Sequence, residues 1–202
     1  MNSKEIYWQG RHVDHADSHF HGSYRERFDR GVFRQATPVL RKDAIIVDIG
    51  AGTGYLSLGF AKMLEDGKVI AIDESKEMLL KLRIRSERLG VANRVDMNQA
   101  DATKTGLPDD SADIVVSAHL LHEVPDPKEV LQEAWRILKP DGILVVQDFR
   151  FGPASLIFKF IHHSTAAGPQ KIRNIHDSLD EIGFSDIIIR EGLLRYIASA
   201  RK

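Results

Sequence analysis

The sequence predicts an α/β protein with a doubly wound, mostly parallel seven-stranded sheet, helices on both faces and an antiparallel C-terminal hairpin. Between residues 44 and 147, short and fully apolar runs alternate with amphipathic segments, which is typical of a parallel sheet covered on both faces. Right-handed crossovers then make such a sheet doubly wound. The last two apolar runs flank only Glu191 and Gly192, and so short a connection requires antiparallel strands.

Each element follows from a local pattern in the sequence. Short apolar runs predict strands, whereas apolar residues recurring every three or four positions predict helices. Pro38, Gly90 and Gly183 mark helix ends, because proline and glycine interrupt helices. In chain order, we expect a helix over 23–40, a strand over 44–49, a helix over 55–64, a strand over 68–72, a helix over 76–89, strands over 94–97 and 112–117, a helix over 128–138, a strand over 142–147, a helix over 175–182, and strands over 185–190 and 193–200.

The 202 residues suffice for one domain, which we expect to span residues 23–202. Residues 1–22 form a polar arm, and residues from about 151 to 174 interrupt the alternation as an insertion near the site. The arm contains His12, His15, His19 and His21, with Asp14 and Asp17 between them. Such side chains can bind Zn²⁺ or Ni²⁺, but their spacing matches no known metal motif. We therefore predict no metal site and favour an arm that folds over the cofactor or stays mobile.

Charge and composition exclude several classes of protein. The formal net charge is −1, with 28 basic and 29 acidic residues, so nothing in the overall charge favours nucleic acid as a partner. Cysteine is absent, which excludes disulfides, thiolate metal sites and a cysteine nucleophile, and fits a cytoplasmic protein. No apolar run is long enough to span a membrane, and the polar first residues do not resemble a signal peptide.

The glycine-rich segment after the first predicted strand is the strongest functional signal. Its glycines, Gly50, Gly52 and Gly54, lie between a strand and a helix, where doubly wound folds bind nucleotides. Glycine permits a tight turn and close contact between backbone and ligand. The dinucleotide fingerprint G-x-G-x-x-G needs a third glycine at the position of Tyr55, so a nicotinamide-dependent oxidoreductase is disfavoured.

Carboxylates follow the next two predicted strands. Asp73 lies 25 residues after Asp48 and can accept hydrogen bonds from both hydroxyls of a ribose. Its negative charge would also repel the 2′-phosphate of a phosphorylated nicotinamide cofactor, which argues against that class of cofactor. An alternative is that Asp73 only caps the helix that begins near Ser75. Asp101 follows the third strand and is also consistent with a local turn cap.

These motifs resemble the class I, Rossmann-like S-adenosylmethionine-dependent methyltransferases over about residues 44–149. Asp113–Ala118 resembles the fourth strand of the family, and Ile137–Val146 resembles the junction that leads to its fifth strand. The general layout is similar to the ubiquinone/menaquinone-type and small-molecule branch. The resemblance implies S-adenosylmethionine as the cofactor and Asp101 as an acceptor for the adenine amino group, while Asp48 is expected to support the loop. The resemblance also implies which residues of this chain form the cofactor site: Asp48, Gly50, Ala51, Gly52, Thr53, Gly54, Tyr55, Asp73, Glu74, Asp101, Ala102 and Ser117.

Three residues after the fourth predicted strand are candidate catalysts: His119, His122 and Glu123. The carboxyl ends of parallel strands line the site, and histidine titrates near neutrality, which suits a general base. The alternative is structural, because many members of the resembling family have a similar histidine here that packs or holds a loop.

The resemblance also narrows the methyl acceptor. The sequence lacks an Asn-Pro-Pro-aromatic motif after the fourth strand and any cysteine, which excludes two common modes of DNA-base methylation. A small molecule such as a quinone precursor, phenol or amine is expected, by direct displacement. A non-catalytic S-adenosylmethionine-binding or metal-sensing module is the alternative, and the oligomeric state stays open.

Overall fold

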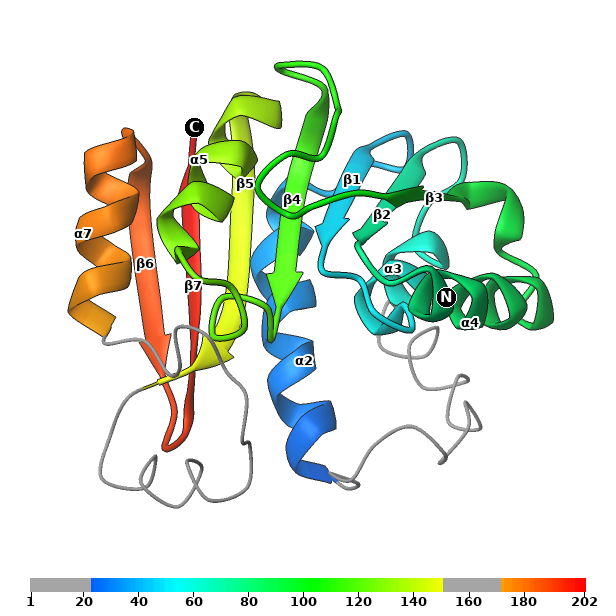
Figure 1. The fold of residues 1–202 in the computed structure, drawn as a ribbon, viewed down its shortest axis with the longest axis horizontal. Coiled ribbons are helices and arrows are strands. Elements are labelled where there is room, and N and C mark those ends of the chain that lie inside the picture. The colour runs from blue at the N-terminus through cyan, green and yellow to red at the C-terminus, as the bar shows by residue number, and fades with distance from the viewer. Residues whose placement is uncertain (1–22, 151–171) are drawn as a thin grey trace.

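The computed structural model describes residues 23–150 and 172–202, and a seven-stranded sheet forms their centre. The strand order is β3-β2-β1-β4-β5-β7-β6, with β7 antiparallel to both of its neighbours and parallel pairing from β3 to β5 (Figure 1). The strands are β1 (Ile45–Ile49), β2 (Lys68–Asp73), β3 (Val95–Gln99), β4 (Ala112–Ala118), β5 (Leu138–Phe149), β6 (Ser185–Glu191) and β7 (Arg195–Arg201). The predicted fold class is therefore confirmed.

Helices cover both faces of the sheet. They are α2 (Ser23–Ala36), continued by the 3-10 turn η2 (Thr37–Val39), then α3 (Tyr55–Ala61), α4 (Lys76–Arg88), the turn η3 (Ala92–Arg94), α5 (Pro127–Ile137) and α7 (Ile172–Ile182). One hydrophobic core joins the sheet to α2, α3 and α4, and a second joins it to α5 and α7. Adjacent residues of β1, such as Ile46 and Val47, are fully buried in opposite cores, which explains why the central strands β1 and β4 are apolar along most of their length.

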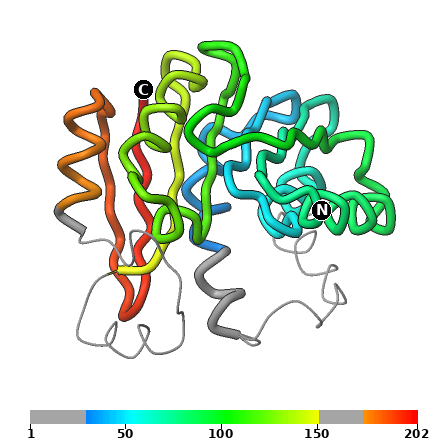
Figure 2. The backbone as a smooth tube through the Cα atoms, viewed as in Figure 1, coloured from blue at the N-terminus to red at the C-terminus, as the bar shows by residue number. Residues whose placement is uncertain are grey.

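Several boundaries differ from the sequence predictions by one to four residues, and three of these differences have consequences for the fold. Strand β5 begins at Leu138 instead of Gly142, because the pairing with β4 shifts register there and Asp141 adopts a left-handed φ of 64° within the irregular stretch. Helix α3 ends at Ala61 instead of residue 64. The hairpin connection extends over residues 192–194, and Figure 2 traces that hairpin along the side of the sheet opposite to β3.

The predicted arm, residues 1–22, lies outside the described residues, and so does the predicted insertion except for residues 172–174, which begin α7. No helix in the described ranges has the length and apolar character needed to cross a membrane.

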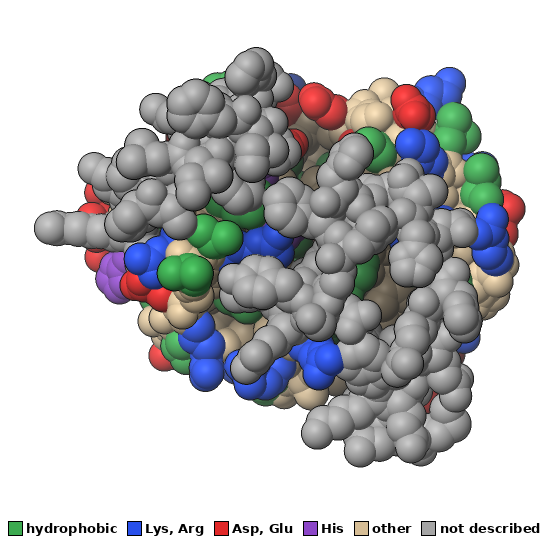
Figure 3. All heavy atoms as spheres, turned by 90° about the horizontal axis from the view of Figure 1, so that it is seen from below, with side chains coloured by type: hydrophobic (Ala, Val, Ile, Leu, Met, Phe, Trp, Pro, Cys, Tyr) green, Lys and Arg blue, Asp and Glu red, His purple; other side chains and the backbone are tan. Residues whose placement is uncertain are grey.

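The strand order places the candidate site. From β1 the chain passes to β2 on one side, and it later returns to β4 on the other side. Such a switch point leaves a crevice at the carboxyl ends of the two central strands, where doubly wound proteins bind ligands. Viewed from that edge, the described surface presents Lys and Arg side chains beside apolar ones (Figure 3).

Candidate active site

The glycine loop after β1 adopts a conformation that only glycine tolerates well. Gly50, Gly52 and Gly54 have φ values of 75°, 53° and 85°. A Cβ on Gly54 would lie 1.9 Å from Leu82 Cδ1, so this glycine allows α3 to start against α4. A Cβ on Gly52 would meet no described atom within 4 Å. The loop therefore has one tightly packed end and one open position at which a ligand can approach the backbone.

The carboxylate of Asp73 lies directly beside this loop. The Gly52 N–H donates to Asp73 Oδ2 at 2.8 Å, and the Ser75 N–H donates to Oδ1 at 2.9 Å. Ser75 is itself the N-cap of α4, because its hydroxyl accepts from the Met78 N–H. Asp73 thus tethers the glycine loop to the start of α4, and each of its oxygens keeps a second lone pair that can accept a ligand hydroxyl.

Asp48 acts inside the protein. Its side chain is buried beneath α3, where Oδ2 accepts hydrogen bonds from the Ser57 N–H at 3.0 Å and the Ser57 hydroxyl at 2.5 Å. Burial raises the pKa of Asp48 to about 6, although both hydrogen bonds from Ser57 oppose the shift. Asp48 therefore fixes the helix that follows the loop.

Replacing Asp48 by asparagine is expected to remove a pH dependence of stability. Because the pKa in the folded state, about 6, exceeds the usual value of 3.8, the folded protein binds the extra proton and stability falls as pH rises from about 4 to 6. The wild type should lose on the order of 2 kcal/mol relative to Asp48→Asn across this window. Urea unfolding at several pH values measures this difference, and parallel curves for the two proteins would contradict it.

The other predicted cofactor residues gather at the same edge. Asp101 is exposed and its Oδ1 accepts from the Thr103 N–H at 2.7 Å and the Thr103 hydroxyl at 2.8 Å, which lowers its pKa. Ser117 is buried and its hydroxyl donates to the Ile49 carbonyl at 2.9 Å. Ala51 is buried, Glu74 is exposed, and Thr53, Tyr55 and Ala102 are half-buried. The sequence patterns did not predict that Arg85 of α4 contacts the loop, where it donates to the carbonyl and hydroxyl of Thr53.

The segment after β4 lies against the glycine loop. A Cβ on Gly50 would lie 3.0 Å from both methyl groups of Leu120, so the segment that contains the candidate catalysts packs directly against the loop. His119 has a left-handed φ of 61°, its N–H donates to the Gln147 carbonyl at 2.9 Å, and its Nε2 lies 3.2 Å from Gln147 Nε2. The strained backbone at His119 turns the chain from β4 toward the end of β5.

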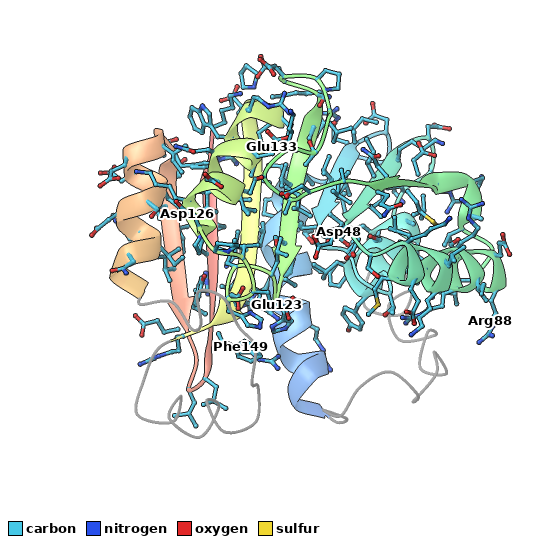
Figure 4. The ribbon with its side chains drawn as sticks, viewed as in Figure 1. Asp48, Arg88, Glu123, Asp126, Glu133 and Phe149 are labelled. Atoms are coloured by element: carbon cyan, nitrogen blue, oxygen red, sulfur yellow. The ribbon has the colours of Figure 1, made fainter. Side chains whose placement is uncertain are left out.

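His122 contacts the end of β5 through a carboxylate. Its Nδ1 lies 2.7 Å from Asp148 Oδ1, and its backbone N–H donates to Asp148 Oδ2 at 3.3 Å. The Asp148 side chain is 0% exposed and that of His122 is 9% exposed, whereas Glu123 is 62% exposed with Oε1 3.7 Å from His122 Nε2. Figure 4 places Glu123 and Phe149 at the edge where β4 and β5 end.

Gln147 and Asp148 were missed as candidates when only the sequence was read. The signal was present, because these two polar residues directly follow the apolar run Ile143–Val146 at the carboxyl end of a buried strand. Within the described residues, no group of three or more potential metal ligands comes together.

Comparisons with known proteins agree with this geometry. A family model described as a methyltransferase domain matches residues 40–183. The ubiquinone/menaquinone biosynthesis C-methyltransferase UbiE of Enterobacter sp. (strain 638) is 32% identical over 111 residues, which cover 54% of this chain and 44% of that protein. The chain thus matches less than half of the length of this relative.

Two solved structures illustrate the shared fold. Phosphoethanolamine N-methyltransferase 2 of Haemonchus contortus, in complex with phosphomonomethylethanolamine and S-adenosylhomocysteine, has a TM-score of 0.74 at 15% identity and covers 87% of this chain and 52% of its own. The [4+2]-cyclase SpnF has a TM-score of 0.74 at 21% identity and covers 92% of this chain and 85% of its own. With the family model spanning most of the chain, this protein belongs to the methyltransferase-domain family, in the class I, S-adenosylmethionine-dependent group.

Proposed function

We propose that this protein transfers a methyl group from S-adenosylmethionine to a small-molecule acceptor by direct displacement. The observation that carries the proposal is the contact between Asp73 and Gly52, which places a carboxylate beside an open glycine loop at the switch point of the sheet. The matched family supplies the cofactor class.

The residues present fit that cofactor. Gly52 offers backbone without a Cβ, with no described atom within 4 Å of the place where a Cβ would lie, and Asp73 offers carboxylate lone pairs that suit two ribose hydroxyls. Asp101 would accept from the adenine amino group, since only its Oδ1 is hydrogen-bonded among the described residues. When bound, S-adenosylmethionine supplies the activated methyl group, and the protein supplies orientation and electrostatics. Holding two reactants in line can contribute up to about 7–11 kcal/mol.

The acceptor is proposed to be small. UbiE is a C-methyltransferase of ubiquinone/menaquinone biosynthesis, and the Haemonchus contortus structure contains phosphomonomethylethanolamine, so both proteins are associated with small molecules. A formal charge of −1 gives nucleic acid no general electrostatic advantage. The lack of cysteine supports a cytoplasmic site of action. For catalysis, His119, His122 and Glu123 are the proposed candidates.

A second candidate function has a specific basis. SpnF has the same fold and is a [4+2]-cyclase, so cofactor binding and methyl transfer must be tested separately. A module that binds S-adenosylmethionine without transferring its methyl group would have an intact glycine loop and Asp73 as well.

Calorimetry should detect binding of S-adenosylmethionine and S-adenosylhomocysteine, and no binding of NAD, because Tyr55 replaces the third glycine of the dinucleotide fingerprint. Transfer of the labelled methyl group is then measured with 1,4-naphthohydroquinone, catechol and phosphoethanolamine as acceptors. Binding with transfer supports the enzyme. Binding without transfer to any acceptor favours the non-catalytic module, and preferential binding of NAD would refute both.

A further inference from the structure

The most unusual side-chain cluster at the carboxyl edge of the sheet is a fully buried carboxylate beneath a histidine. Asp148 is the penultimate residue of β5, and its side chain is 0% exposed. A buried ionised carboxylate is costly unless it is hydrogen-bonded and paired. Asp148 accepts from the backbone N–H groups of His122 at 3.3 Å and Phe149 at 2.6 Å. Its only potentially cationic partner in the described part of the chain is the His122 imidazole.

We propose that Asp148 is a positioning residue that orients His122 as the general base of methyl transfer. The inference rests on the proposed function, and it selects His122 from the three candidate catalysts His119, His122 and Glu123. An ionised carboxylate can only accept hydrogen bonds, so the 2.7 Å contact places the proton on Nδ1 of His122. The neutral imidazole then has its lone pair on Nε2, which makes Nε2 the basic atom.

The orientation of the ring agrees with this role. Nε2 lies 3.7 Å from Glu123 Oε1, and because Glu123 is 62% exposed, the Nε2 edge is the one nearer to the outside. The Phe149 ring meets the His122 ring edge-on, with centroids 4.8 Å apart at 81°. Phe149 and Asp148 therefore restrict the imidazole from two sides, and this preorganisation reduces the cost of holding a base in place.

His119 is held in a different way. Its Nε2 faces the amide of Gln147 at 3.2 Å, and its ring centroid lies 5.0 Å from that of Phe149. A neutral amide cannot stabilise an imidazolium as a carboxylate does. His122 has a carboxylate against its ring that would stabilise its imidazolium, and His119, whose ring lies beside an amide, is the position for comparison.

The assignment also defines a class of acceptor. General-base catalysis is useful where the acceptor must lose a proton to become a good nucleophile, as with a phenol, or with a hydroquinone whose ring carbon is activated when its hydroxyl loses a proton. As the bond between that atom and the methyl carbon forms, the bond from methyl carbon to sulfur breaks. The acceptor proton moves to Nε2 of His122, and the resulting imidazolium stays paired with Asp148 until it releases the proton to water.

The first test uses the wild-type protein alone. In ¹⁵N NMR spectra of histidine-labelled protein at pH 8, His122 should show a protonated Nδ1 and an unprotonated Nε2, with its signals assigned from their loss in His122→Gln. In Asp148→Asn the amide can donate to Nδ1 and favour the opposite tautomer, as in serine-protease triads. An Nε2–H tautomer in the wild type would overturn the proposal, whether or not methyl transfer is found.

The second test is kinetic, with 1,4-naphthohydroquinone as the acceptor. Asp148→Asn and His122→Gln should each lower kcat by ~10²–10⁴-fold while KM changes little. Asp148→Glu should recover part of the loss, and affinity for S-adenosylmethionine should stay unchanged. The matched control is Asp126→Asn, at an exposed N-cap of α5 that asparagine can also fill, which should leave kcat unchanged.

The outcomes separate the two proposals. A wild type that binds S-adenosylmethionine, shows the expected tautomer and transfers no methyl group to the hydroquinone contradicts the proposed base while leaving cofactor binding intact. A folded Asp148→Asn variant with normal kcat refutes the positioning role and leaves the methyltransferase intact. If Asp148→Asn does not fold, normal kcat in the folded His122→Gln variant refutes the proposed base, and with it the positioning role of Asp148.

Discussion

Replacing Gly54 by alanine is expected to lower the free energy of unfolding by about 2–4 kcal/mol, the largest effect on stability predicted for this protein. Two costs combine. Gly54 is the N-cap of α3 with φ 85° and ψ 32°, a left-handed conformation that strains any residue with a Cβ. The new Cβ would also lie 1.9 Å from Leu82 Cδ1 and 3.1 Å from Leu82 Cγ. Leu82 is fully buried, so it can move only by repacking the core.

The matched control for this prediction is Gly90→Ala. Gly90 has a similar φ of 68°, but a Cβ there would meet no described atom within 4 Å. It should therefore cost only the conformational penalty, roughly 1–2 kcal/mol. Urea unfolding of both variants measures the difference. Equal destabilisation would show that the close approach of α4 to the loop contributes nothing, contrary to the packing described above.

Replacing Asp73 by alanine is expected to weaken binding of S-adenosylmethionine by ~10–150-fold, equivalent to about 1.5–3 kcal/mol. The variant removes the proposed acceptor for the ribose hydroxyls. It also leaves the Gly52 N–H and the Ser75 N–H without their carboxylate, so the glycine loop loses its tether to α4. Calorimetry with S-adenosylmethionine and S-adenosylhomocysteine should show the same loss for both ligands, because they share the ribose.

The control for this variant is Asp96→Ala on the neighbouring strand β3. Asp96 is exposed and pairs with Lys68, and such surface ion pairs contribute little to stability. Its affinity for S-adenosylmethionine should equal that of the wild type. Unchanged affinity in a folded Asp73→Ala protein would remove the ribose assignment and leave Asp73 as a structural tether alone.

Much of the fold could be predicted because the signals for it are local. The apolar runs predicted all seven strands, and the short connection assigned to Glu191 and Gly192 predicted the antiparallel hairpin. Boundaries were less accurate where tertiary pairing overrides local pattern. The irregular start of β5 at Leu138 depends on its register with β4. The local sequence Lys139–Gly142 instead predicts a turn, so the strand was predicted to begin only at Gly142.

The candidate site was only partly predictable. Spacing along the chain indicated Asp73, which the structure places against Gly52, but it could not reveal that both of its oxygens already accept backbone N–H groups. The sequence predicted that Asp48 supports the loop, and it left Asp101 open between an acceptor for adenine and a local turn cap. In the structure, Asp48 accepts hydrogen bonds from Ser57 and Asp101 accepts them from Thr103. The cofactor roles of these residues stay predictions.

The sequence by itself determined the fold class, the glycine loop and the family, because hydrophobic periodicity, glycine positions and carboxylates at strand ends can each be recognised within a short segment of the chain. Only the tertiary structure decided which candidate base is paired with a carboxylate. His122 and Asp148 are 26 residues apart, and nothing local to either residue specifies their contact. His122 lies in the segment after β4, whereas Asp148 lies at the end of the neighbouring strand β5. The pairing of β4 with β5 brings the two side chains together, and burial then makes the carboxylate depend on the imidazole.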